Sequence, residues 1–195
     1  MKQDFETIYQ KNKWGNGSGS GSVPKYCDKY LQFLSKFLTD NSIKSVVDIG
    51  CGDFQLYENF DWSKVSYAGC DISSTALSMA RERTNLPLHE VSSLDETLNF
   101  VKNQNPELVI LKDVMMHWTD DELEYFLTRL NEFPWKWVVT ANNYKYSRDP
   151  SKNGRPRELD RYRWAPIPNN HPTFVEFGFT PVMKYWAKQV MISCK

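Results

Sequence analysis

A short apolar run that ends at two closely spaced glycines constrains the fold of this 195-residue chain more than any other feature. Residues 45–49 read Ser-Val-Val-Asp-Ile, and Gly50-Cys51-Gly52 follows at once. β-Branched residues favour a buried strand, and glycine lets the backbone turn tightly and approach a ligand closely. A strand that runs into such a turn is typical of a doubly wound sheet, in which the turn binds a nucleotide-like cofactor. Gln55 stands where the dinucleotide fingerprint has its third glycine, which disfavours a bound pyrophosphate.

Strand and helix patterns alternate along most of the chain. The predicted strands are residues 45–49, 65–70, 88–91, 108–111, 137–140, 180–186 and 189–193. The predicted helices are residues 24–38, 54–60, 73–83, 119–130 and 173–177, with a further one that begins after Ser93. Alternation predicts a parallel sheet, and two successive strands at the end predict an antiparallel hairpin. The expected fold class is therefore α/β, with a doubly wound, mostly parallel seven-stranded sheet and a C-terminal antiparallel hairpin.

Length and composition indicate a single domain over residues 1–195. Lys plus Arg and Asp plus Glu both number 24, so no net field favours nucleic acid or an anionic membrane as the partner. No stretch approaches the roughly 20 apolar residues of a membrane span, and the N-terminus lacks an apolar signal region. The four cysteines show no C-x-x-C pairing, which indicates reduced thiols in a cytoplasmic protein.

The residues around the glycine turn carry a family resemblance. Asp48 lies two positions before Gly50, and an acid there suits a cofactor with a positively charged group. The run from Asp48 to Gly52 resembles motif I of the class I S-adenosylmethionine (SAM) methyltransferases, although Phe54 replaces the family's usual third glycine. The resemblance implies that Gly50, Cys51 and Gly52 contact SAM and that Asp48 holds its ammonium group.

Two further segments match cofactor positions of that family. Asp71 ends the second predicted strand, about 20 residues beyond the glycines, where an acid accepts hydrogen bonds from ribose hydroxyls; Ile72 lies beside it. The alternative for Asp71 is an exposed turn aspartate. The family wraps the adenine ring after the third strand, which implies a role for Ser92, Ser93 and Leu94; alternatively, Ser93 only caps its helix.

The segment after the fourth predicted strand reads Lys112-Asp113-Val114-Met115-Met116-His117 and resembles the family's D-V-x-x-H signature. Ligands of a doubly wound sheet lie beyond the carboxyl ends of its strands, so Lys112 is expected at the cofactor and Asp113 and His117 at the acceptor. Either could act as the general base, because both side chains can accept a proton near working pH. His117 could instead pack over the sheet edge. A magnesium ion on Asp113 with Asn142 or Asn143 is an alternative that the sequence does not favour.

Residues 14–22 form the one low-complexity stretch, Trp-Gly-Asn-Gly-Ser-Gly-Ser-Gly-Ser. Composition alone is typical of a flexible linker. The stretch also resembles an N-terminal segment of a subgroup of small bacterial and viral methyltransferases that share C-G-D-F in motif I. On that resemblance, residues 1–40 form an N-terminal lid and helix, with Trp14 as a wall of the cofactor site. Ser20 and Ser22 would then hydrogen-bond the methionine carboxylate.

Residues 142–172 look irregular and are predicted to form the substrate loop, because long loops in compact domains are usually functional. Basic residues outnumber acidic ones between Lys145 and Arg163, and Tyr144, Tyr146, Tyr162 and Trp164 are interleaved with them. Such a pattern suits a stacked sugar, a phosphate-bearing small molecule or nucleic acid. A solvated, salt-bridged loop is the fourth interpretation.

The favoured function is a SAM-dependent O-methyltransferase. It would transfer a methyl group by in-line displacement to a hydroxyl of a sugar, glycan or other small molecule, with Asp113 or His117 as base. Nucleic-acid or protein N-methylation is the alternative, but Lys112-Asp113-Val114-Met115 replaces the N/D-P-P-Y/F element of amino-methylating DNA enzymes. A non-catalytic SAM-binding subunit is the third hypothesis. The oligomeric state does not follow from the sequence.

Overall fold

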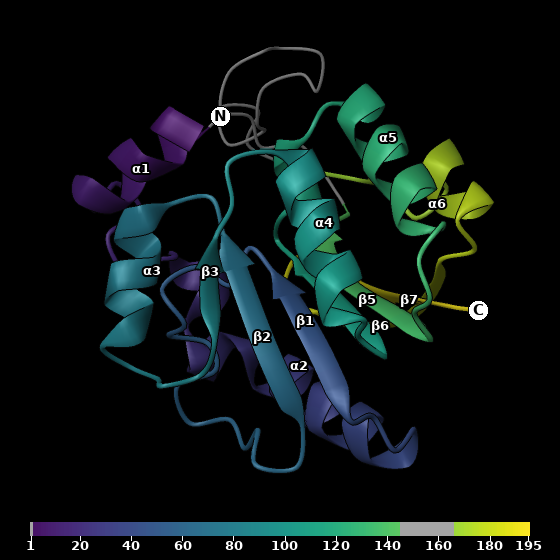
Figure 1. Ribbon diagram of the computed structural model, residues 1–195, viewed down its shortest axis with the longest axis horizontal. Helices are drawn as coiled ribbons and strands as arrows, with labels where there is room; N and C mark the ends of the chain where they lie inside the picture. Colours follow the sequence, from purple (N-terminus) through teal and green to yellow (C-terminus); the bar gives the residue numbers. More distant parts are fainter. Residues whose placement is uncertain (1, 145–165) are drawn as a thin grey trace.

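The fold is a seven-stranded mixed sheet with helices on both faces (Figure 1). The computed structural model describes residues 2–144 and 166–195. Its strands are β1 (Ser45–Ile49), β2 (Ser66–Asp71), β3 (Leu88–Glu90), β4 (Leu108–Lys112), β5 (Trp137–Asn143), β6 (Thr180–Tyr185) and β7 (Lys188–Cys194). Their order is β3-β2-β1-β4-β5-β7-β6, and β7 runs antiparallel to both of its neighbours. The predicted sheet and its C-terminal hairpin are confirmed.

The helices are α1 (Lys2–Gln10), α2 (Pro24–Asp40), α3 (Ser74–Arg81), α4 (Leu94–Gln104), α5 (Asp120–Leu130) and α6 (Pro172–Glu176). Two 3₁₀ turns, η1 (Ser20–Ser22) and η2 (Met115–His117), lie in the connections. Apolar residues of α2 and α3 cover one face of the sheet, and those of α4, α5 and α6 cover the other. In the described part of the chain, no helix is long and apolar enough to cross a membrane.

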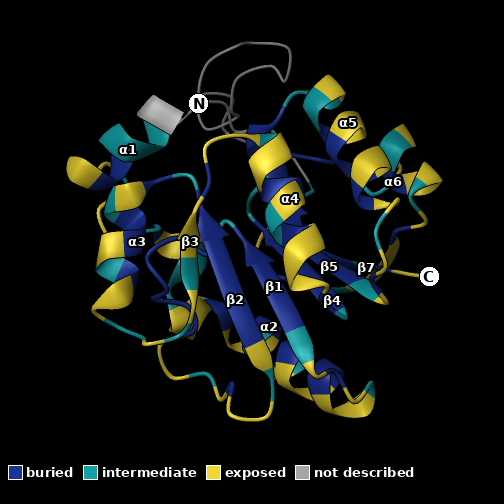
Figure 2. Cartoon of the chain, in the orientation of Figure 1, coloured by how far each residue is buried: buried dark blue, intermediate teal, exposed yellow. Residues whose placement is uncertain are grey.

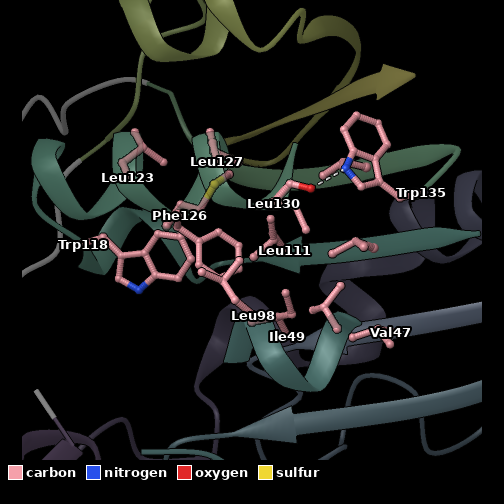
Figure 3. Packing of buried hydrophobic residues seen from close by; sticks show 14 of the residues in the cluster. Val47, Ile49, Leu98, Leu111, Trp118, Leu123, Phe126, Leu127, Leu130 and Trp135 are labelled. Atoms are coloured by element: carbon pink, nitrogen blue, oxygen red, sulfur yellow. Dashed lines mark hydrogen bonds between the residues drawn. The ribbon is translucent and has the colours of Figure 1, made fainter. Parts of the chain in front are cut away.

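Side chains that alternate along the central strands fill both halves of the core. Val46 packs in the cluster under α2, whereas Val47 and Ile49 pack in the cluster under α4 and α5. In the second cluster, Leu98 lies over the strands, and Trp135 donates a 2.9 Å hydrogen bond from its indole to the carbonyl of Leu130 (Figure 3). The central strands are therefore buried, the edge strands β3 and β6 are partly exposed, and the helices turn exposed faces outward (Figure 2).

The structure corrects three local predictions. Residues 54–60 form successive turns instead of a helix, because Phe54 adopts a left-handed backbone conformation with φ 63° that a right-handed helix does not continue. Strand β5 extends to Asn143, so the irregular segment begins later than residue 142. Helix α1 was not predicted as a helix. Residues 145–165 of the predicted substrate loop, including Tyr146, Tyr162 and Trp164, lie outside the described residues.

Candidate active site

A cavity of about 520 Å³ lies at the carboxyl ends of the parallel strands, where ligands of doubly wound sheets bind. Its size is within the usual range for a small-molecule site, about 300–1,000 Å³. Its wall includes most of the residues predicted for the site, namely Trp14, Ser20, Ser22, Gly50, Cys51, Gly52, Asp71, Ile72, Ser93, Leu94, Lys112, Asp113 and His117. The structure thus brings together segments from five connections of the fold.

Two predicted residues do not line this cavity. Asp48 lies behind the glycine turn and borders a smaller pocket with Ser22 and Lys112. Ser92 is exposed, and both its backbone N–H and its hydroxyl donate 2.7 Å hydrogen bonds to the carboxylate of Glu96. The contacts of Ser92 are therefore those of a helix terminus.

The turn after β1 requires glycine at two positions. Gly50 and Gly52 have φ values of 72° and 60°, which side chains rarely tolerate. A Cβ atom on Gly50 would lie 2.3 Å from Cγ2 of Val114, and one on Gly52 would lie 2.4 Å from Oγ of Ser18. The backbone at this turn is therefore closely covered on one side and borders the cavity on the other.

Asp71 both fixes the glycine turn and borders the cavity. Its carboxylate accepts 2.9 Å hydrogen bonds from the backbone N–H groups of Gly52 and Ser73. Burial raises the pKa of Asp71 to about 6, against the opposing effect of those N–H groups. Each carboxylate oxygen has a further lone pair, so the group can still accept hydrogen bonds from a ligand. Asp71 is 7% exposed, so it is not the exposed turn aspartate of the alternative interpretation.

Asp48 is a buried carboxyl group that is hydrogen-bonded to a tyrosine. Tyr67 donates a 2.9 Å hydrogen bond to it from its hydroxyl. Burial raises the pKa of Asp48 to about 7, despite the hydrogen bond from Tyr67 and the nearby charge of Lys112. A cation bound next to Asp48 would favour its ionised form.

Residues 14–22 form an ordered wall of the cavity. The hydroxyl of Ser18 donates a 2.6 Å hydrogen bond to the carboxylate of Asp53. The side-chain amide of Asn16 donates a 3.2 Å hydrogen bond to the side-chain oxygen of Gln55. The side-chain amide of Gln55 in turn donates a 2.8 Å hydrogen bond to the backbone carbonyl of Asn16. These contacts tie the segment to the residues that follow Gly52, and they are not those of a flexible linker.

Helix α1 covers the cavity from outside the sheet. Phe5 and Tyr9 line the cavity, and the carboxylate of Glu6 accepts a 2.8 Å hydrogen bond from the hydroxyl of Ser73 at the start of α3. The ring of Trp14 packs edge-on against Phe5 and Tyr9, with centroids 6.1 and 5.8 Å away. Glu6 thus fastens α1 to α3 while three aromatic rings cover the site.

His117 lies in this aromatic wall. Its ring centroid is 5.1 Å from that of Phe5 and 6.5 Å from that of Trp14, with the indole nearly parallel to the imidazole at 21°. The side chain is 8% exposed and borders the cavity. Its position is fixed by packing against the N-terminal segment.

Asp113 is held between two lysines. The ammonium of Lys112 lies 2.7 Å from one carboxylate oxygen, and that of Lys188 contacts the other. Burial acts to raise the pKa of Asp113, but the two ammonium groups outweigh it and leave the pKa below its ordinary value. A carboxylate stabilised in this way is a weak base, so these ion pairs disfavour Asp113 for proton removal.

The same contacts bear on the magnesium alternative. The side-chain oxygen of Asn143 accepts a 3.0 Å hydrogen bond from Lys188, and both oxygens of Asp113 also face ammonium groups. Within residues 2–144 and 166–195, no cluster of three His, Cys, Asp or Glu side chains could hold a metal. The oxygens of Asp113 and Asn143 considered for Mg²⁺ are therefore bonded to lysines, whereas the side-chain amide of Asn142 donates to the hydroxyl of Thr140.

The sequence reasoning missed several residues of the cavity wall, among them Phe5, Tyr9, Ser18, Trp186 and Lys188. Lys188 carried one usable signal, its position just before the last predicted strand; in the structure it pairs in register with Asn143 at the end of β5. Phe5 and Tyr9 carried none, because their burial depends on contacts between α1 and a distant helix.

No family model and no curated protein sequence matches this chain. Solved structures do resemble it. Magnesium protoporphyrin IX methyltransferase from Synechocystis PCC 6803, with bound SAH, has a TM-score of 0.63 and 14% identity, covering 86% of this chain and 82% of that one. The DhpI–SAH complex has a TM-score of 0.66 at 12% identity, covering 100% and 94%. The methyltransferase domain of bacterial CtHen1 has a TM-score of 0.61 at 16% identity, covering 85% and 97%.

These similarities extend over nearly the whole of each pair of chains, and they agree with the strand order and the C-terminal hairpin described above. The chain has the fold of the class I SAM-dependent methyltransferases.

Proposed function

We propose that this chain is a SAM-dependent methyltransferase that transfers a methyl group to a hydroxyl of a sugar, glycan or other small molecule. The observation that carries the proposal is the juxtaposition of the G-x-G turn and Asp71 on one wall of a 520 Å³ cavity. Two of the similar structures contain SAH, the demethylated form of the cofactor, in the same fold.

The cavity wall fits the chemical groups of SAM. Asp71 would accept hydrogen bonds from the ribose hydroxyls, and Asp48 would compensate the charge of the amino group from behind the turn. Ser20, Ser22 and Lys112 offer donors for the carboxylate, since all three border the cavity. The backbone of Gly50 and Gly52 borders the cavity, where a ligand can approach it closely.

Bound SAM would supply an electrophilic methyl group on a positively charged sulfur. The protein's part is to align the acceptor hydroxyl, exclude water and remove a proton. The rings of Phe5, Tyr9 and Trp14 cover the cavity and would exclude water. We assign proton removal to His117, because Asp113 is stabilised as a carboxylate by Lys112 and Lys188.

The test is methyl transfer from isotopically labelled SAM to panels of glycans, nucleosides and peptides. Label on a sugar hydroxyl supports the proposal, and label on a nucleobase or peptide nitrogen supports the alternative N-methyltransferase. Binding of SAM without transfer to any panel supports a non-catalytic subunit. His117→Ala should reduce transfer at least tenfold with SAM affinity nearly unchanged, whereas the exposed His89→Ala should match the wild type.

A further inference from the structure

The cavity wall contains a buried charge cluster with more positive than negative groups. Lys112 and Lys188 both contact the carboxylate of Asp113, and their side chains are only 5% and 7% exposed. The ammonium of Lys188 also donates a 3.0 Å hydrogen bond to Asn143, and that of Lys112 a 2.7 Å bond to the carbonyl of Gly21. Two ammonium groups share one carboxylate, so these three side chains hold more cationic than anionic groups, and burial lowers the pKa of Lys188 against the opposing effect of Asp113.

The other acidic side chains of the described wall are engaged elsewhere. Asp71 accepts backbone N–H groups at the glycine turn, and Glu122 accepts the backbone N–H of Thr119 at the start of α5. Asp48, behind the turn, accepts a hydrogen bond from Tyr67, and burial raises its pKa to about 7. An uncompensated charge is unfavourable in a buried site, and an anion that binds there would remove the penalty.

The sheet order separates this cluster from the residues assigned to the nucleoside. The G-x-G turn and Asp71 follow β1 and β2, whereas the cluster belongs to the ends of β4 and β5 and to the start of β7. Because β7 is antiparallel, its first residue, Lys188, lies beside Asn143 at the carboxyl end of β5. Lys188 thus borders the half of the cavity beyond β4, on the side away from Asp71.

An aromatic rim continues from the cluster. Trp186 and Ala187 border the same cavity, and the indole of Trp186 is 62% exposed. That ring stacks on Tyr26 with centroids 5.9 Å apart. A ring or sugar could lie against this rim while a charged substituent reaches the ammonium of Lys188.

We propose that the methyl acceptor carries an anionic group, a carboxylate or a phosphate ester, and that Lys188 binds it. The inference rests on the proposed methyltransferase function and narrows its substrate class. The carboxylate of the cofactor is the competing occupant of the cluster, because Lys112 contacts the loop that contains Ser20 and Ser22.

The experiment measures binding of three sugar probes by saturation-transfer NMR, with and without saturating SAH. The probes are glucose 6-phosphate, methyl β-D-glucuronide and the neutral methyl β-D-glucoside, so that phosphate and carboxylate are compared with an uncharged sugar. The variants are Lys188→Met, Lys188→Arg and, as the matched control, Lys184→Met, which removes an exposed lysine of the same hairpin.

In the SAH complex, at least one anionic probe should bind about tenfold more tightly than the neutral one, as expected for a charge-assisted hydrogen bond. Lys188→Met should abolish this preference, while Lys188→Arg and Lys184→Met should keep it. Equal affinities, no binding of either anion, or a preference that survives in Lys188→Met would overturn the inference.

Displacement of the anions by SAH would also overturn it, because the cluster would then hold the cofactor carboxylate. The SAH titration itself separates the two proposals. Failure of SAH to bind the wild type contradicts the methyltransferase function, whereas SAH binding without anion preference contradicts only the role of Lys188.

Discussion

Ser18 and Asp53, 35 residues apart, form two hydrogen bonds with each other: the Ser18 hydroxyl donates to the carboxylate at 2.6 Å and accepts the Asp53 backbone N–H at 3.0 Å. The hydroxyl of Tyr9 lies 2.8 Å from the same Ser18 oxygen. One serine thus joins α1, the Gly/Ser loop and the residue after the G-x-G turn. The contact gives a physical reason for the Gly/Ser loop and C-G-D-F to occur together.

Ser18→Ala should weaken SAH binding by about tenfold and lower the melting temperature by several degrees. The change removes an oxygen that positions the loop over the cavity, and the loss of a hydrogen bond to a charged group is worth about 1.5–3 kcal/mol. Isothermal calorimetry measures the affinity. Ser35→Ala, at an exposed position of α2, is the matched control, and equal affinities in the two variants would contradict the role of Ser18.

Gly52→Ala should abolish SAH binding and destabilise the protein, because its Cβ would lie 2.4 Å from the Ser18 hydroxyl. Gly15→Ala isolates the backbone contribution, since Gly15 also has positive φ, 75°, but a Cβ there would meet no atom within 4 Å. That control should lose only about 1–2 kcal/mol of unfolding free energy. Urea denaturation and calorimetry are carried out on both variants. A larger loss in Gly52→Ala than in Gly15→Ala would show that the contact with Ser18 excludes a side chain from the turn, in addition to the cost of positive φ.

Phe54→Gly should destabilise the fold despite removing backbone strain. Phe54 has φ 63°, and a left-handed conformation costs a non-glycine residue about 1–2 kcal/mol. Its ring is 2% exposed and packs against Tyr57 and Tyr67, and removal of a buried Phe ring costs about 3–5 kcal/mol. We expect a net loss of about 1–4 kcal/mol in urea denaturation, the difference of these two effects. A more stable variant would mean that strain outweighs packing.

The pH dependence of stability should follow the buried carboxyl groups of Asp48 and Asp71. Burial raises its pKa to about 7 and that of Asp71 to about 6, above the unfolded value of about 3.9. Between these values the folded protein holds protons that the unfolded chain has lost. The free energy of unfolding of the ligand-free protein should therefore fall as the pH rises from about 4 to about 7.

An ammonium group of the cofactor next to Asp48 would favour the ionised form of the Asp48 carboxyl group. SAM affinity should therefore rise from about pH 6 to about pH 8, and binding should release protons. Calorimetry in buffers of different ionisation enthalpy measures that release. Asp48→Asn should bind more weakly and lose this pH dependence, and an unchanged pH profile would contradict the assignment.

The fold followed from the sequence because local patterns agree with the tertiary structure along β1, β2, β4 and α5. In α5, for example, the capping box at Thr119 and Glu122 is present as predicted. Helix α1 was missed because its position depends on Glu6, which contacts Ser73 and Thr75 more than sixty residues away. Periodicity within residues 2–10 carries no information on such a contact.

The candidate site was predictable where it lies on parallel strands, since every parallel strand ends at the same edge of the sheet. Lys188 comes from the antiparallel strand, whose first residue reaches that edge only because of its register with Asn143. Asp113 was predicted at the site, but its contact with the second lysine, Lys188, depends on that same register. The location of Asp113 could therefore be predicted from the sequence, whereas its ion pair with Lys188, which depends on strand pairing, could not.

The central claim is that the glycine turn and Asp71 bind SAM, and calorimetric titration of SAH into the wild type and Asp71→Ala tests it most directly. We predict one SAH per chain in the wild type and affinity at least tenfold weaker in the variant, from loss of hydrogen bonds to a carboxylate. No binding to the wild type, or equal dissociation constants in the two proteins, would contradict the account.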